Sequence, residues 1–518
     1  MMGKYSNKFR SIQLVIILFS ILLHTNCKKE IVEAEWEVYT PASIDATGGN
    51  WKPIIVSHDS VTVATPNAIS STEYTEELKS IKNLLASLTE EQKEIVSYWS
   101  FGALRWNEIA RQLVAKYNLA PEANADGTYP FPDATHPSDY PVFPFANPPY
   151  ASRVYAYLSV AQYDGLVSAW YYKFSFQRPA PHMVDGSIVP LIYSNNLPSY
   201  PSEDAVIASA SCAILKAMFP LEVDMLNAKL TEHENSRLWA GANVQSDITA
   251  GDALGKAIAA KLLARAKTDG FGAAKGSQLI WDSLANLISS SGGIPWKSLE
   301  IPPRPAQLPL FGNVKNWTFD AVTKELLRPG PPPSIGSTEF LSALDEVKKY
   351  SQKLTRDQYR IADFWSDGIG SYTPPGHWNR IACDLIVKYK LSQLRTARTL
   401  ALLNMSVEDA GICCWETKTY YYYPRPSQID PEITTTIGLP NFPSYTSGHS
   451  TFSGAASTVL GYIFPNEAGS LNIMATEASL SRLYGAIHYR FDCEVGLFCG
   501  KNIGQYAVTI GQNDGSPQ

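Results

Sequence analysis

The last third of the chain places two histidines among fixed positive charges and small hydrogen-bond donors. Lys418 and Arg425 are followed by the segment Ser447-Gly448-His449, and Arg482 and His488 come last. Cations combined with hydroxyl and backbone N–H donors suit a tetrahedral oxyanion that passes through a five-coordinate state. One histidine would bond the central atom of that anion, and the other would move protons.

The spacing of these residues predicts the elements that position them. Lys418 and Arg425 are seven residues apart, which is two helical turns, so they would share one face of a helix. A loop over residues 443–449 is expected to lead into a helix rich in small residues that starts at Ser450. Its first turn would offer unpaired N–H groups to an anion.

A further helix is expected over residues 481–492. Its polar positions Ser481, Gly485, His488 and Asp492 follow one another at spacings of four, three and four residues. Such spacings put side chains on one helix face. The sequence therefore predicts that Asp492 orients the His488 ring.

The chain also contains two copies of one pattern. The segment from Leu88 to Gly102 recurs from Leu354 to Gly368, and from Arg153/Arg398 onward the copies are separated by 245 residues. Periodicity is helical through most of the chain. We therefore predict an all-α protein of two homologous helical bundles in tandem, of which the second carries the active site.

The two copies differ at the positions on which the chemistry depends. His449 and His488 of the second copy align with Asp204 and Asn243 of the first, whereas lysine, arginine and serine are present in both. A bundle that lacks both titratable rings cannot perform the same chemistry. We expect the first copy to be structural.

The predicted organisation has five segments. They are a signal peptide (1–27), an N-terminal extension (28–84), a first helical bundle with a degenerate site (85–265), a Pro-rich connector (266–349) and a second, catalytic helical bundle (350–518). The first segment has basic residues followed by an apolar run, residues 14–23, that is too short to span a bilayer comfortably.

Cys27 ends this segment and is followed by polar residues, which resembles the lipidation site of a bacterial lipoprotein. Cleavage at another nearby bond is the alternative. We expect an exported protein, located in the periplasm or at the outer membrane as a lipid-anchored protein.

Composition excludes several classes of partner and site. A formal net charge of -6 without a basic stripe gives no electrostatic reason to expect nucleic acid. The six cysteines after Cys27 fit no zinc pattern. Cys493 and Cys499 could pair outside the cytoplasm, although buried free thiols are favoured for all six.

Three sequence motifs, taken together, carry a resemblance to a known family. Lys418-x6-Arg425-Pro426, Ser447-Gly448-His449 and Ser481-Arg482-x5-His488-x3-Asp492 occur in this order. They resemble the signature of the vanadium haloperoxidase and type 2 phosphatidic acid phosphatase superfamily. Thr446 departs from the pattern, because the family usually has proline there.

The resemblance implies a role for each residue of the motifs. His488 would be bonded to vanadium in a haloperoxidase, or phosphorylated in a phosphatase, and His449 would be the acid–base. The oxygens of bound vanadate or phosphate would be held by Lys418, Arg425, Arg482, Ser447 and the Gly448 N–H.

Three more residues are implicated by the resemblance. Asp367 occupies the place of an aspartate that pairs with the second arginine, here Arg482, in the fungal chloroperoxidases. Trp415 and Phe442 match aromatic residues that flank the halide and peroxide side of the chloroperoxidase site. Trp170 matches Trp415 in the first copy, so a structural role for Trp415 stays open, as does a packing role for Phe442.

The function implied is a vanadate-dependent haloperoxidase, which oxidises halide with hydrogen peroxide to hypohalous acid and so halogenates a small organic acceptor. The alternative is a soluble acid phosphatase that hydrolyses a phosphate ester through a phosphohistidine. A scaffold or carbohydrate-associated surface lipoprotein is disfavoured by the intact motifs. Paired bundles of this family often form homodimers, which is one possible assembly here.

Overall fold

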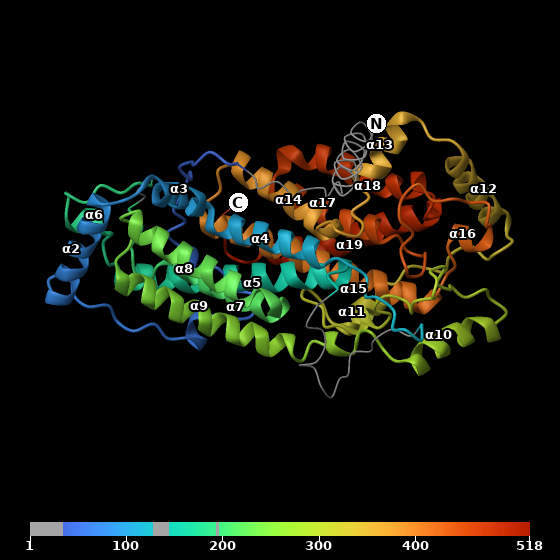
Figure 1. Ribbon diagram of the computed structural model, residues 1–518, viewed down its shortest axis with the longest axis horizontal. Helices are drawn as coiled ribbons and strands as arrows, with labels where there is room; N and C mark the ends of the chain where they lie inside the picture. Colours follow the sequence, from blue (N-terminus) through green and yellow to red (C-terminus); the bar gives the residue numbers. More distant parts are fainter. Residues whose placement is uncertain (1–34, 128–144, 193–195, 518) are drawn as a thin grey trace, which may run out of the picture. The chain divides into compact units, whose positions relative to one another are not determined.

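Helices make up 64% of the protein in a computed structural model that describes residues 35–127, 145–192 and 196–517 (Figure 1). No strand occurs among these residues, so the predicted all-α fold class is confirmed. Contacts divide the chain into Met1–Trp36 and Glu37–Gln518, and the helices below belong to the second unit. The predicted signal peptide and Cys27 lie outside the described residues.

The helices form two series whose members recur in the same order. The first series is α2 (Thr72–Ala86), α3 (Glu90–Tyr98), α4 (Gly102–Tyr117), α5 (Pro148–Phe176), α6 (Pro181–Val184), α7 (Glu203–Met218), α8 (Val223–Trp239) and α9 (Gln245–Ala266). The second series is α12 (Thr338–Gln352), α13 (Arg356–Phe364), α14 (Thr373–Lys388), α15 (Gln393–Tyr421), α16 (Pro426–Ile429), α17 (Gly448–Ile463), α18 (Ala468–Tyr484) and α19 (Arg490–Gln512). Between the two series lie α10 (Gln278–Ser290) and α11 (Ala321–Leu326).

Matched helices of the two series have nearly the same length. Helices α5 and α15 both have 29 residues, and α7 and α17 both have 16. Figure 1 shows the first series, coloured blue to green, gathered on one side and the orange to red second series on the other. This arrangement is consistent with the predicted tandem bundles.

Each series begins one helix earlier than the sequence indicated. The predicted boundaries at residues 85 and 350 fall inside α2 and α12, which both have 15 residues. Phe340 and Val347 of α12 share a buried cluster with Tyr423 and Tyr489 of the second series. The predicted connector is therefore partly helical, and its last helix packs with the second bundle.

Each of the two longest helices uses a buried aspartate to fix a segment outside the bundle. Asp164 of α5 accepts backbone N–H groups of residues 54–56 at 2.7–2.8 Å. Asp409 of α15 accepts those of Trp317 and Thr318 at 2.8 and 2.9 Å. Burial raises the pKa of each carboxyl to about 6, although these hydrogen bonds act in the opposite direction. The N-terminal extension and the connector thus dock in the same way.

A buried chain of amides joins the two series where α5 packs against α15. Asn107 of α4 donates to Asn379 of α14 at 2.7 Å, and Asn379 donates to Asn404 of α15 at 2.7 Å. Asn404 in turn donates to the Ser159 hydroxyl of α5 at 2.9 Å. All four side chains are fully buried, so each relies on the others for its hydrogen bonds.

Two further expectations concern the state of the cysteines and the presence of membrane-spanning helices. The six cysteines in the described part of the chain are buried free thiols, as favoured from the sequence. Within the same residues, no helix combines the length and the apolar character needed to cross a membrane.

Replacing Asn404 by leucine should lower the free energy of unfolding by about 1–3 kcal/mol, because one N–H of Asn379 and the hydroxyl oxygen of Ser159 would lose their buried hydrogen-bond partner. Urea unfolding followed by circular dichroism measures this loss. Asn83→Leu, on the exposed face of α2, is the matched control and should leave the midpoint nearly unchanged. Equal midpoints for the two variants would contradict a stabilising role for the amide chain.

Candidate active site

Lys418 and Arg425 are brought together by the end of α15 rather than by a shared helix face. The helix ends at Tyr421, Tyr422 has a left-handed φ of 44°, and Arg425 caps the short helix α16. The prediction of one helical face is therefore wrong. Lys418, at the last turn of α15, points its ammonium at the Pro443 and Ser444 carbonyls, 2.7 and 2.8 Å away.

The Arg425 guanidinium is held beside His488 by backbone carbonyls. Its Nε donates to the Phe442 carbonyl at 2.9 Å, and its Nη1 donates to the Ile487 carbonyl at 2.6 Å and lies 3.3 Å from His488 Nε2. Its Nη2 is buried and has no hydrogen-bond partner in the structure. A buried guanidinium nitrogen without an acceptor fits a site that receives an anion.

The segment Ser447-Gly448-His449 forms the start of α17, which begins two residues earlier than the helix expected from Ser450. Ser447 is the N-cap, and its hydroxyl oxygen accepts the Ser450 N–H at 3.4 Å. The Gly448 and His449 N–H groups belong to the first turn, where a helix has no carbonyl to offer them. A helix start of this kind is suited to bind the oxygens of an anion.

The segment 481–492 is two helices with a turn between them, not the single helix expected. Helix α18 ends at Tyr484, Ala486 has a φ of 58°, and α19 starts at Arg490. The predicted contact is nevertheless present, because Asp492 Oδ2 lies 2.9 Å from His488 Nδ1. The same oxygen accepts the Tyr489 N–H at 3.1 Å, so Asp492 also caps α19.

This contact determines which nitrogen of His488 is available for chemistry. When Nδ1–H donates to Asp492, Nε2 carries the lone pair. Burial, followed by the charges of Arg425 and Lys418, holds the pKa of His488 well below its usual value. A neutral ring with its lone pair beside Arg425 is suited to bond the central atom of an oxyanion.

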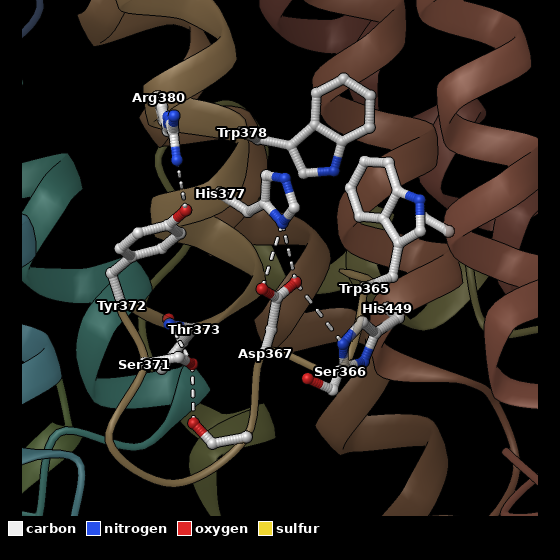
Figure 2. Close-up of polar contacts among 12 residues, drawn as sticks. Trp365, Ser366, Asp367, Ser371, Tyr372, Thr373, His377, Trp378, Arg380 and His449 are labelled. Atoms are coloured by element: carbon white, nitrogen blue, oxygen red, sulfur yellow. Dashed lines mark hydrogen bonds and ion pairs between the residues drawn. The ribbon is translucent and has the colours of Figure 1, made fainter. Parts of the chain in front are cut away.

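Arg482 and Asp367 do not form the ion pair that the resemblance implied. Arg482 donates instead to the backbone carbonyls of Trp365 and Ser366. Within the described residues, the ion-pair partners of the Asp367 carboxylate are His377 Nδ1, 3.1 Å from its Oδ1, and His449 Nε2, 3.8 Å from its Oδ2 (Figure 2).

His449 faces Asp367 and the anion site at once. The side chain is 15% exposed, and its Nε2 is buried without a hydrogen-bond partner in the structure. Burial, together with the charges of Arg482 and His377, holds the pKa of His449 well below its usual value. The ring is therefore neutral near pH 7 and able to accept a proton.

His377 was missed in the sequence. It begins the second turn of α14 and stacks on Trp365, with ring centroids 4.4 Å apart. The sequence nevertheless marks this position as one where the two copies differ. His377 aligns with Arg105 of the first copy, next to the matched Trp106 and Trp378. The comparison that selected the other two histidines would also have selected this one.

The site holds more positive charge than the protein neutralises. Lys418, Arg425 and Arg482 are each 1% exposed. Burial lowers the pKa of Arg425 to about 9 and that of Arg482 to about 10, and burial also lowers the pKa of Lys418. Buried cations are stable only when paired. The residues thus fit a tetrahedral oxyanion such as vanadate or phosphate.

Phe442 and Trp415 form one wall of this site. The Lys418 ammonium and the Arg425 guanidinium each lie 5.0 Å from the centre of the Phe442 ring. Trp415 packs against Phe442 with ring centroids 5.0 Å apart and is fixed by its N–H, which donates to the Gln307 carbonyl. Phe442 therefore contacts the cations directly, and Trp415 supports it from behind.

In the first series, carboxylates take the place that an anion would have. Glu203 and Asp204 start α7 where Gly448 and His449 start α17. Glu203 lies 2.7 Å from Lys173, and Asp204 lies 3.5 Å from Arg237. The cations kept in the first copy are thus neutralised within the protein.

Comparisons with known proteins agree with this geometry. Residues 398–515 match the PAP2 superfamily model. Vanadium chloroperoxidase of Curvularia inaequalis is 28% identical over 158 residues, which is 25% of this chain. The match spans only 25% of the length of that relative.

Two solved structures resemble the chain over a longer range. A bacterial vanadium-dependent iodoperoxidase has a TM-score of 0.57 at 24% identity, covering 70% of this chain and 91% of its own. A holo-type bacterial vanadium-dependent chloroperoxidase has a TM-score of 0.50 at 13% identity, covering 74% and 96%. At these identities the likeness concerns the fold. The chain has the vanadium haloperoxidase fold, and its residues 398–515 resemble the PAP2 superfamily.

Proposed function

We propose that this protein is a vanadate-dependent haloperoxidase that oxidises halide with hydrogen peroxide to hypohalous acid. The observation that carries the proposal is the cluster of three buried cations around His488 Nε2, with Arg425 Nη2 lacking an acceptor. The relatives with vanadium in their names support the choice of vanadate as the oxyanion.

The chain's own residues would hold vanadate on several sides. His488 Nε2 would bond the vanadium, kept in position by the hydrogen bond from Nδ1 to Asp492. Lys418, Arg425 and Arg482 would offset the negative charge of the oxygens. Bound vanadate would supply a Lewis-acidic centre that activates hydrogen peroxide toward halide without a change of oxidation state.

His449 and the aromatic wall would complete the reaction site. The neutral His449 Nε2 would accept a proton from hydrogen peroxide, and the Asp367 carboxylate 3.8 Å away would stabilise the imidazolium formed. Phe442 and Trp415 would exclude water from the side of the cations, which strengthens their interaction with the anion.

The same cations and His488 would also serve a phosphatase, because vanadate and phosphate share their tetrahedral geometry. Three features favour the haloperoxidase: the paired helical series, the aromatic wall against the cations, and the coverage of 91% of the iodoperoxidase chain. The assay therefore has to offer both substrates.

We expect the purified full chain to halogenate a phenolic dye with hydrogen peroxide and iodide, bromide or chloride only after orthovanadate is added. His488→Ala should lower this rate by at least about 100-fold, because vanadium would lose its protein ligand. His182→Phe, in the first series, is the control and should keep the wild-type rate.

Two other results would overturn the proposal. Hydrolysis of a phosphate ester that vanadate inhibits, without halogenation, would identify the protein as a phosphatase. Halogenation that persists in His488→Ala would remove His488 as the vanadium-binding residue.

Anion binding should weaken as the pH rises from 6 to 9. Burial and neighbouring cations hold the pKa values of His488 and Lys418 low when no anion is present. A bound anion would raise both, so binding takes up protons, and each proton changes the affinity by about tenfold per pH unit. Calorimetry with sulfate, whose own charge is constant in this range, measures the effect. An affinity independent of pH would contradict this electrostatic account.

One oxyanion per chain is expected, because carboxylates neutralise the cations of the first series. Equilibrium dialysis with radiolabelled sulfate or phosphate gives the number of sites. Arg425→Ala should abolish binding, whereas Arg178→Ala, at a buried arginine of the first series, should leave one site. Two sites in the wild-type chain would show that Glu203 and Asp204 do not close the first site.

A further inference from the structure

His377 holds the carboxylate that faces His449. Its Nδ1 lies 3.1 and 3.2 Å from the two oxygens of Asp367. Figure 2 shows Asp367 between the His377 ring above and the His449 ring beside it, with dashed lines to both. The three side chains come from α14, from the loop after α13 and from the start of α17.

The position of the Asp367 carboxylate is not fixed by the nearest arginine. Arg482 donates to the carbonyls of Trp365 and Ser366 rather than to Asp367. Asp367 itself has a left-handed φ of 43° in a short loop. The side-chain hydrogen bonds that orient its carboxylate come from His377.

The groups that face His449 come from every element around it. They are Arg482 of α18, His377 of α14, Asp367, the backbone carbonyls of Trp365 and Ser366, and His488 of the turn before α19. Of these, only Asp367 is a carboxylate, so its distance from His449 determines how strongly a proton on that ring is stabilised.

A packing role alone does not account for His377. His377 is 6% exposed and its ring stacks on Trp365. The ring also packs edge-on against Phe364, with ring centroids 5.0 Å apart. Phenylalanine would fill the same aromatic niche without bringing a polar atom that must be satisfied. The nitrogen that distinguishes histidine is the one directed at Asp367.

We propose that His377 is a positioning residue for the acid–base His449 and acts through Asp367. This proposal rests on the proposed role of His449. By donating to both carboxylate oxygens, His377 keeps Asp367 directed at His449 and shares its negative charge. His449 then stays neutral until it accepts a proton.

Replacing His377 should shift the protonation equilibrium of His449 in a defined direction. In His377→Phe the stacking on Trp365 remains, but Asp367 loses its donor. The carboxylate then acts with its full charge on His449 or turns toward Arg482, and either change favours a proton on His449. His377→Asn retains an N–H near the place of Nδ1 and should preserve the wild-type balance.

The test follows the His449 ring by NMR in the full chain labelled with ¹⁵N-histidine, without vanadate. The His449 signal is identified by its loss in His449→Gln. We expect His377→Phe to move the titration midpoint of His449 up by about one pH unit, while His377→Asn and the control His182→Phe leave it within a few tenths. The acidic limb of the pH–rate profile should shift in the same direction.

The outcomes separate this proposal from the proposed function. An unchanged His449 titration in a folded His377→Phe would overturn the positioning role, as would a shift of equal size in His377→Asn. The NMR result does not depend on which reaction the protein catalyses. Failure of the halogenation assay would therefore not contradict the positioning role of His377, because His449 could be the acid–base of a phosphatase.

Discussion

The carboxyl group and the backbone of Asp492 connect all the parts of the candidate site. Its Oδ2 lies 2.9 Å from His488 Nδ1 and accepts the Ser444 hydroxyl at 2.5 Å and the Tyr489 N–H at 3.1 Å. Its backbone carbonyl accepts the Ser447 N–H at 2.9 Å. One residue at the start of α19 thus fixes the His488 ring, the loop that meets Lys418 and the beginning of α17.

The first series keeps this scaffold without the histidines. Asp247 accepts the Val244 N–H at 2.9 Å, and its carbonyl accepts the Ser202 N–H at 2.9 Å. Asn243, at the place of His488, is turned to bond Ser199 and Ser202. The aspartate is therefore needed for the loop to fold, and its effect on a histidine ring is added to that role.

The two series solve the same electrostatic problem in different ways. Both bury a lysine and two arginines, and such charges need partners inside a protein. The first series supplies them as Glu203 and Asp204 at the start of α7. The second series has Gly448 and His449 there, so its cations are left for an external anion. Two positions thus account for a large part of the difference in charge between the two series.

Much of this could be predicted from the sequence, because it depends on residue types at fixed separations. The all-α class, the recurrence of the pattern and the His488–Asp492 contact are of this kind. The helix expected over 481–492 failed because Asp492 serves as a cap of α19, which is a contact across a turn that happens to share helical spacing. The start of each series was misplaced although Ser71-Thr72-Glu73 recurs as Ser337-Thr338-Glu339, at the same separation as Leu88 and Leu354.

The contacts of Asp367 and His377 could not be read from spacing at all. Their meeting depends on how α14 packs against the loop after α13, and on Arg482 finding carbonyl partners of its own. A comparison of the two copies would have marked His377 as different from Arg105, but not what it touches. Comparing the sequences of the two copies identifies the residues that differ between them. The packing of the helices then determines which of these residues are in contact.

The first series also helps to position the candidate site, although none of its residues belongs to that site. Helix α15, which carries Lys418 and Trp415, packs along α5 over a buried face where Asn404 bonds Ser159. A polar contact inside an apolar interface permits one register, because a shifted helix would leave the amide without a partner. The position of the Lys418 ammonium relative to α17 thus depends on a bundle whose own cations are paired with carboxylates, which gives a physical reason for the chain to keep both copies.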